Sequence, residues 1–315
     1  MILFGLRDIG PANACLPVFK ILNQRGLPVV IYAEGPAAEY LKNKTSFVTR
    51  CKITDLLDSV RPSLVVITPS TIGGAIPISL INEAKKRNLP VILFEDLWSG
   101  HSCSEWNVLP DAVCVVDSFA KKLVRESWLG YPESNIHITG GPVFDKFVNI
   151  QTGPAGYKLR KTLDLSKNWP VIFFPGEVFG MTQAVQMLVE ALNGLNVPVY
   201  LILRDHLKIT SPEASDEYKQ IYLEYCGALK NLKAGIVINS SKLTSDEVNS
   251  GSDVVVGICS TMLVEACYMC KPVLHIWTPE IGQALFEVAS NTFAEMPTTN
   301  LGAALKAESV EEIKG

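Results

Sequence analysis

Short apolar runs alternate with helix-like stretches along the first half of the chain. Apolar residues recur with helical spacing in residues 76–87 and 119–127, and a short run rich in apolar residues follows each stretch, at residues 91–94 and 136–139. Runs that are apolar on both faces are typical of strands buried in a parallel sheet. We therefore expect six strands in this half, at residues 2–6, 29–33, 64–68, 91–94, 112–116 and 136–139.

The same alternation restarts after residues 149–157, where glycine and proline are dense enough to predict a linker. Strands joined by helices of this length form βαβ units, in which helices cover both faces of a parallel sheet. The sequence thus predicts an α/β protein of two Rossmann-like domains, residues 1–150 and 151–315. Five more strands are expected, at residues 171–174, 198–203, 235–238, 253–256 and 273–277.

The composition agrees with two globular domains and restricts the kinds of partner that the protein could bind. The chain has 315 residues, of which 48% are hydrophobic, so it has ample material for two cores. A net charge of −4 gives no electrostatic case for nucleic acid as a ligand. No apolar run approaches the roughly 20 residues of a transmembrane helix, and no signal-peptide pattern is evident. We expect a cytoplasmic protein; its oligomeric state and any peripheral membrane contact stay open.

The chain contains 8 cysteines, including a Cys-x-x-Cys spacing at Cys267 and Cys270. A zinc site would need a second cysteine pair or a nearby histidine pair, and the sequence offers neither. We interpret the cysteines as reduced structural thiols and predict no metal site and no cofactor.

Residues 252–277 carry the clearest candidate binding site. They read as a buried strand, a turn containing Gly257, a helix, and a Lys-Pro break into another strand. Ser260 is placed to cap the helix, so it and Thr261 would present free N–H groups to a phosphate at the carboxyl end of the strand. Glu265, about one turn further along, could hold two ribose hydroxyls. The alternative is a simple helix cap and a solvated glutamate.

These residues resemble the second-domain signature of GT-B glycosyltransferases and the related UDP-N-acetylglucosamine 2-epimerases, with Cys270 where those families usually have glycine. Residues 138–145, Ile-Thr-Gly-Gly-Pro-Val-Phe-Asp, resemble the turn that ends the first domain in the same superfamily, with Gly141 in place of asparagine. The resemblance extends in order over residues 1–280. It implies two domains facing each other across a cleft, a nucleotide-sugar donor bound by the second domain and an acceptor bound by the first.

Two further loops fit donor binding. Gly176 and Glu177 follow the first strand of the second domain, where glycine allows a close approach of the backbone to phosphate. Arg204 and His206 follow the next strand and could pair with phosphate oxygens. This second loop loosely resembles that of CDP-glycerol glycerophosphotransferases, although Leu207 stands where proline is expected. Ordinary strand-to-helix turns remain the alternative for both loops.

The first domain offers the candidate acceptor site and base. Gly10 and Asn13 lie in a predicted loop after the first strand, which resembles the acceptor loop of GT-B enzymes. Asp96 follows the fourth strand and is our candidate general base, with Glu95 and His101 as rivals. Glu95 and Asp96 could instead cap a helix.

The sequence therefore favours a glycosyltransferase that moves a sugar from a nucleotide-diphosphate donor to an unknown hydroxyl acceptor. An epimerase or a glycerophosphotransferase is the alternative within the same fold. A non-catalytic nucleotide-sugar-binding protein is the alternative from another class, because it would keep the Ser260 and Glu265 site and lose the base.

Overall fold

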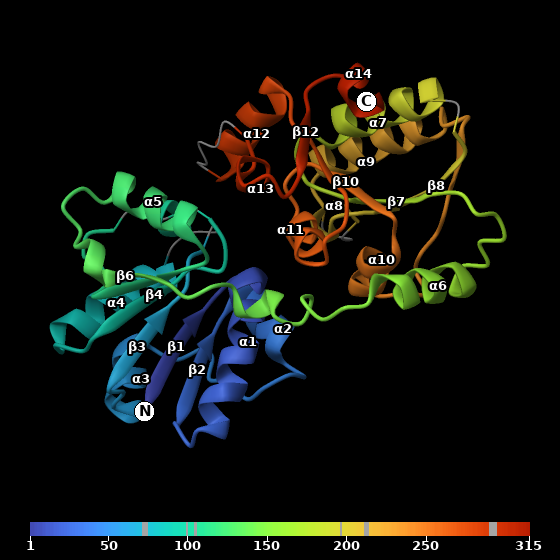
Figure 1. Cartoon of the computed structure of the whole chain (residues 1–315). Coiled ribbons are helices and arrows are strands. Elements are labelled where there is room, and N and C mark those ends of the chain that lie inside the picture. Colours follow the sequence, from blue (N-terminus) through green and yellow to red (C-terminus); the bar gives the residue numbers. More distant parts are fainter. Residues whose placement is uncertain (71–74, 99, 104–105, 196, 211–213, 290–294) are drawn as a thin grey trace. The chain divides into compact units, whose positions relative to one another are not determined.

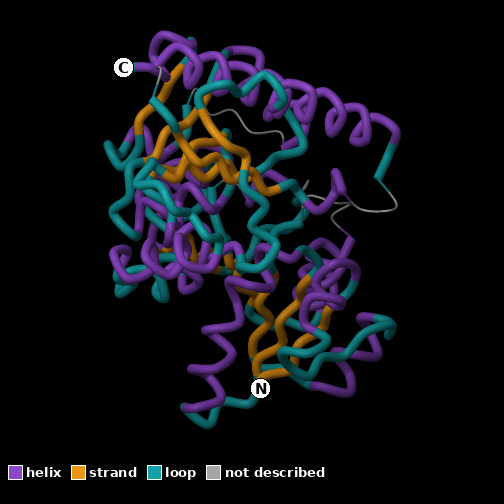
Figure 2. The backbone as a smooth tube through the Cα atoms, turned by 90° about the vertical axis from the view of Figure 1, so that its right-hand side faces the viewer, coloured by secondary structure: helices purple, strands orange, loops and turns teal. Residues whose placement is uncertain are grey.

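The computed structural model contains two compact units, Met1–Asp145 and Lys146–Val288 with Thr292–Gly315 (Figure 1). It describes the whole chain except residues 71–74, 99, 104–105, 196, 211–213 and 290–294. Each unit is a parallel sheet with helices packed along it (Figure 2). The α/β fold predicted from the sequence is therefore confirmed.

Unit 1 is built on a six-stranded sheet in the order β2-β1-β3-β4-β5-β6, and all neighbouring strands pair in parallel. All six predicted strands are present. Their bounds are Ile2–Leu6 (β1), Val29–Ala33 (β2), Leu64–Ile67 (β3), Val91–Phe94 (β4), Ala112–Val115 (β5) and Ile136–Ile138 (β6).

Helices cover both faces of this sheet. Leu3 and Phe4 are neighbours in β1 but belong to two separate hydrophobic clusters, because successive strand residues point to opposite faces. Phe19 of α1 packs in the cluster of Phe4, and Leu80 of α4 packs in the cluster of Leu3. The helices are Ile9–Gln24 (α1), Gly35–Leu41 (α2), Ile53–Val60 (α3), Ala75–Lys86 (α4) and Ser118–Ser127 (α5), with 3₁₀ turns at Gly100–Cys103 (η1), Glu133–Asn135 (η2) and Pro142–Phe144 (η3).

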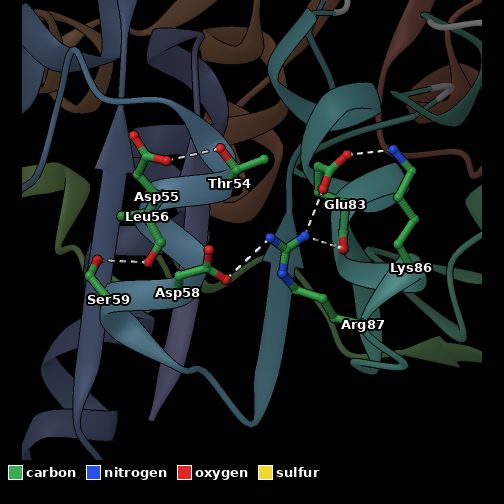
Figure 3. A network of polar contacts seen from close by, with 8 residues as sticks. All are labelled: Thr54, Asp55, Leu56, Asp58, Ser59, Glu83, Lys86 and Arg87. Carbon is green, nitrogen blue, oxygen red and sulfur yellow. Dashed lines mark hydrogen bonds and ion pairs between the residues drawn. The ribbon is translucent and has the colours of Figure 1, made fainter.

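A polar network joins α3 to the end of α4 on the surface of unit 1 (Figure 3). Arg87 donates to the Glu83 carboxylate at 2.6 Å and to Asp58 of α3 at 3.2 Å. Lys86 donates to the other oxygen of Glu83 at 2.6 Å. Arg87 thus joins carboxylates from two helices that lie on the same face of the sheet.

Unit 2 repeats the plan with the order β12-β11-β10-β7-β8-β9, again all parallel. The five predicted strands are present, and the sequence pattern missed β12, which has only three residues. The strands are Val171–Pro175 (β7), Val199–Arg204 (β8), Gly235–Val237 (β9), Val254–Gly257 (β10), Val273–Ile276 (β11) and Leu305–Ala307 (β12).

The predicted linker at residues 149–157 is wrong in part, because helix α6 begins at Thr152. Its glycines and proline lie in the first two turns, where proline costs no helical hydrogen bond. Leu159 of α6 is buried, and Gly251 of α10 leaves room for it: a Cβ there would lie 2.7 Å from the Cβ of Leu159. The helices of unit 2 are Thr152–Thr162 (α6), Met181–Leu195 (α7), Leu207–Thr210 (α8), Asp216–Leu229 (α9), Ser245–Gly251 (α10), Thr261–Tyr268 (α11), Pro279–Ala289 (α12), Pro297–Asn300 (α13) and Val310–Lys314 (α14).

The strand orders locate the binding positions that this fold offers. In unit 1 the chain leaves β1 toward β2 and returns to β3 on the other side of β1, and in unit 2 it leaves β7 toward β8 and returns to β10. The loops after such a pair of strands diverge and open a crevice at the carboxyl edge of the sheet. Ligand positions are therefore expected beyond β1 and β3 and beyond β7 and β10.

Candidate functional site

The loop after β7 begins with a close backbone approach. The N–H of Gly176 donates to the carbonyl of Arg204 at 2.7 Å. A Cβ at Gly176 would lie 2.6 Å from that carbonyl oxygen, so only glycine fits there. Gly176 therefore holds the ends of β7 and β8 together at the edge of the crevice.

The loop after β10 ends in the predicted helix cap, which the structure confirms. Ser260 has a non-helical backbone conformation, and its hydroxyl accepts from the N–H of Met262 at 3.4 Å. Thr261 is the first residue of α11 and is exposed. The first turn of α11 thus opens beside the β7 loop with N–H groups and the positive end of the helix dipole, an arrangement suited to an anion.

Glu265 lies in the second turn of α11 and is buried. Its carboxylate accepts from the side-chain amide of Asn249 in α10 at 3.3 Å. Burial, together with the nearby charge of Asp246, raises the pKa of Glu265 to about 7. The solvated-glutamate alternative is therefore wrong. Asn249, which the sequence patterns did not single out, is the residue that orients Glu265.

Glu177 lies in the loop after β7 and Cys259 lies in the loop after β10, and their side chains are in contact. The Cys259 thiol hydrogen-bonds to the Glu177 carboxyl, which is 8% exposed. Burial raises the pKa of Glu177 to about 8. Glu177 is thus a neutral acid near pH 7, which removes a negative charge from a position that would otherwise repel a diphosphate.

Unit 2 should lose stability as the pH rises, because Glu177 must ionise. Its pKa is near 4.5 in an unfolded chain and about 8 in the fold. The contribution of this proton to the free energy of unfolding is therefore fully present below pH 4.5 and is lost as the pH rises to about 8. Glu177→Gln mimics the neutral acid and removes this dependence. Between pH 5 and 8 we expect the thermal midpoint of the parent protein to fall by ~5 °C more than that of the variant. Parallel midpoint curves from calorimetry would contradict this.

Arg204 does not extend toward the crevice as a free phosphate ligand. Its guanidinium donates to the hydroxyls of Ser240 and Ser245 at 3.0 and 2.9 Å and to the carbonyls of Ser240 and Leu243. These contacts fix the segment before α10. His206, on the same loop, lies at the start of α8 and supplies the backbone against which Gly176 packs.

In unit 1, Asp96 lies at the corresponding crevice, at the end of β4. A Cβ on Gly10 would lie 2.8 Å from the Asp96 carboxylate, so this carboxylate lies against the first turn of α1. Across the crevice, the Ser70 hydroxyl donates to Asp8 at 3.3 Å. Burial, with the charges of Glu95 and Asp8 adding to it, raises the pKa of Asp96 to about 7. A carboxylate titrating there suits general-base chemistry at neutral pH.

The two rivals of Asp96 are bonded to each other. Glu95 accepts from the His101 ring at Nδ1 at 2.7 Å and from the backbone N–H of His101. Both side chains are about 1% exposed. Of the three candidates, only Asp96 faces the crevice with its carboxylate uncommitted to this buried pair. The alternative that these carboxylates cap a helix holds for Glu95, because the His101 N–H that it accepts from lies in the first turn of η1.

The predicted acceptor loop is wrong as a loop. Gly10 and Asn13 belong to helix α1, which begins at Ile9, only three residues after the end of β1. Pro11 lies in the first turn, where it costs nothing, so it did not mark a break. Gly10 still contacts the crevice through Asp96. Asn13 instead accepts from the hydroxyl of Tyr40 in α2 at 2.7 Å.

The described residues contain neither a candidate metal centre nor a candidate membrane-spanning helix. Among them, no group of three histidine, cysteine, aspartate or glutamate side chains is arranged to hold a metal ion. No helix in that part of the chain is long and apolar enough to cross a membrane.

No family model matches this sequence, and no curated protein matches it. Solved structures do. A UDP-GlcNAc 2-epimerase from Neisseria meningitidis, bound to UDP-GlcNAc, matches 99% of this chain and 89% of its own at 15% identity and a TM-score of 0.62. A glycosyltransferase from Rickettsia africae matches 99% and 86% at 16% identity and a TM-score of 0.63.

S. aureus MnaA, in a structure with UDP, matches 99% of this chain and 86% of its own, at 12% identity and a TM-score of 0.68. At such low identity the likeness concerns the fold and not the reaction. It spans nearly the whole chain and both parallel sheets in order. This chain therefore has the GT-B type of fold, with two Rossmann-like domains.

Proposed function

We propose that this protein is an enzyme that acts on a UDP-sugar, with unit 2 binding the UDP and unit 1 providing the base. The observation that carries the proposal is the crevice of unit 2. There, the Gly176 loop, the capped start of α11 and the buried Glu265 lie at the strand crossover where this fold binds nucleotides. Similar structures contain UDP or UDP-GlcNAc, which supports uridine as the nucleoside of the donor.

In this proposal the first turn of α11 carries the diphosphate. Its N–H groups and dipole stabilise negative charge, and the charge on the diphosphate grows as the bond to the sugar breaks. Ser260 keeps the turn open and Thr261 adds a hydroxyl. Glu265 accepts hydrogen bonds from the ribose, with Asn249 holding its carboxylate. Glu177 is neutral because its pKa is raised, so it does not repel the diphosphate.

We assign the reaction as glycosyl transfer to a hydroxyl acceptor. Transfer needs one base to take the proton of the attacking hydroxyl, and Asp96 supplies one. Epimerisation at a sugar carbon instead removes a proton from one face and returns one to the other, which calls for a second free acid–base group. Glu95 and His101 are committed to each other. The 2-epimerase remains the second candidate, because the similar structure from Neisseria meningitidis is a UDP-GlcNAc 2-epimerase.

One experiment separates these reactions. Purified protein is incubated with UDP-GlcNAc in deuterated water, with and without a panel of hydroxyl acceptors, and followed by NMR. Transfer or slow donor hydrolysis releases UDP and leaves the proton at C2 in place. Epimerisation yields the 2-epimer with deuterium at C2. Tight binding of UDP with neither product would favour the non-catalytic alternative.

Glu265→Ala should weaken UDP binding by roughly 10- to 100-fold, because hydrogen bonds to a charged group contribute about 1.5–3 kcal/mol. Calorimetric titration with UDP measures the change. Glu190→Ala is the matched control, since Glu190 is an exposed glutamate of α7, and it should bind like the parent. Equal affinities for the two variants would remove Glu265 from the site.

A further inference from the structure

A second constellation lies behind the candidate base, on the side of the sheet covered by α5. The buried His101 ring bridges two residues: its Nδ1 contacts Glu95 at 2.7 Å and its Nε2 contacts the Ser127 hydroxyl at 3.0 Å. Ser127 is the last residue of α5 and is exposed, whereas His101 and Glu95 are about 1% exposed. An accessible hydroxyl is thus joined to an interior histidine and carboxylate.

The hydrogen bonds determine which ring nitrogen carries the proton. A carboxylate accepts only, so the Glu95 contact requires a proton on Nδ1. Nε2 is then the basic nitrogen, and the Ser127 hydroxyl donates to it. This is the order of roles found when a histidine activates a serine: a carboxylate orients the ring, and the ring takes the serine proton.

The surroundings keep this histidine in place. Its ring packs edge-on against Trp128 at 5.6 Å between centroids, and its carbonyl accepts from the indole of Trp106 at 2.5 Å. Glu95 also accepts from the backbone N–H of His101, so the carboxylate is fixed at two points. Its other oxygen, Oε2, is buried and has no hydrogen-bond partner among the residues that the structure describes. An uncompensated buried oxygen is costly, which favours a function for this carboxylate beyond packing.

We propose that Ser127, His101 and Glu95 form a second active site, with Ser127 as a nucleophile toward acyl esters. Ser127 Oγ forms a bond to the acyl carbon while its proton passes to His101 Nε2. The ester C–O bond then breaks, and the leaving alcohol takes that proton. Water next attacks the acyl-serine, gives a proton to Nε2, releases the acid and restores the Ser127 hydroxyl. Glu95 holds the ring throughout.

A fluorophosphonate probe tests the nucleophile in the unmodified full-length protein. We expect one covalent adduct, located at Ser127 by peptide mass spectrometry. Ser134, an exposed serine of the same unit whose hydroxyl donates to the Asn135 side chain at 3.1 Å, serves as the internal reference. Labelling of Ser127 no faster than that of Ser134 would overturn the proposal.

Hydrolysis of p-nitrophenyl acetate tests the activity. Because Ser127 is exposed, Ser127→Ala should keep the thermal midpoint of the parent while the rate falls roughly 100-fold or more. His101→Gln should also lower the rate, provided that its midpoint shows a folded protein. An esterase rate equal in the parent and in Ser127→Ala would overturn the proposal regardless of the histidine variant. UDP binding is independent of both outcomes, so the donor site of unit 2 is tested separately.

Discussion

Asp96→Asn is expected to lower kcat of the UDP-sugar reaction by roughly 100- to 10,000-fold while leaving the affinity for UDP unchanged. The amide has nearly the shape of the carboxylate and fits against Gly10 in the same way, but it cannot take a proton. UDP is bound by unit 2 in our proposal, so its affinity should not depend on this residue. Steady-state rates and calorimetric titration measure the two quantities.

The pH profile gives the same assignment an independent test. Burial raises the pKa of Asp96 to about 7, and only the ionised form acts as a base. The value of kcat should therefore fall as the pH is lowered through 7, when it is measured with saturating donor so that titration of Glu265 in the donor site does not contribute. In Asp96→Asn this acid limb should vanish. Asp55→Asn, a change of the same kind at an exposed aspartate of α3, should behave like the parent. A variant with near-normal turnover would exclude Asp96 as the base.

The fold was accessible from the sequence because parallel strands are apolar on both faces and therefore stand out. Every expected strand is present, and β12 escaped notice because its three residues, Leu-Lys-Ala, are too few and too polar to form such a run. The helices were harder. Glycine and proline near the beginnings of α1 and α6 read as breaks, whereas in a first turn they cost little.

Residues of the candidate site could be predicted from the sequence only where their contacts are local in the chain. The Ser260 cap follows from local sequence, since a serine after a strand and before an apolar helix satisfies the free N–H groups. Contacts between residues that lie far apart in the chain could not be predicted from the sequence. The pairing of Arg204 with residues 240–245 and that of Glu265 with Asn249 arise from the packing of β8 and α11 against the segment at α10. The Glu95–His101 pair is close in sequence, but its Ser127 partner depends on where α5 packs.

Leu263→Ala should lower the free energy of unfolding of unit 2 by about 2–5 kcal/mol, the range for deleting a fully buried leucine. Leu263 is 0% exposed, lies in the first turn of α11, and belongs to the core cluster that includes Phe173 of β7. A methyl group of Leu263 also fills the space beside Gly257, where a Cβ would approach it to 3.1 Å. Denaturant unfolding at constant pH measures the loss.

This leucine matters for the site as well as for stability, because it holds the start of α11 against the end of β10. Where enough of the variant is folded, UDP should bind more weakly than to the parent, since the N–H groups at Ser260 are no longer held toward the crevice. Leu223→Ala, the same change at an exposed leucine of α9, should change neither quantity by more than ~0.5 kcal/mol. If Leu263→Ala lost stability but bound UDP with full affinity, the placement of the diphosphate on this helix would be wrong.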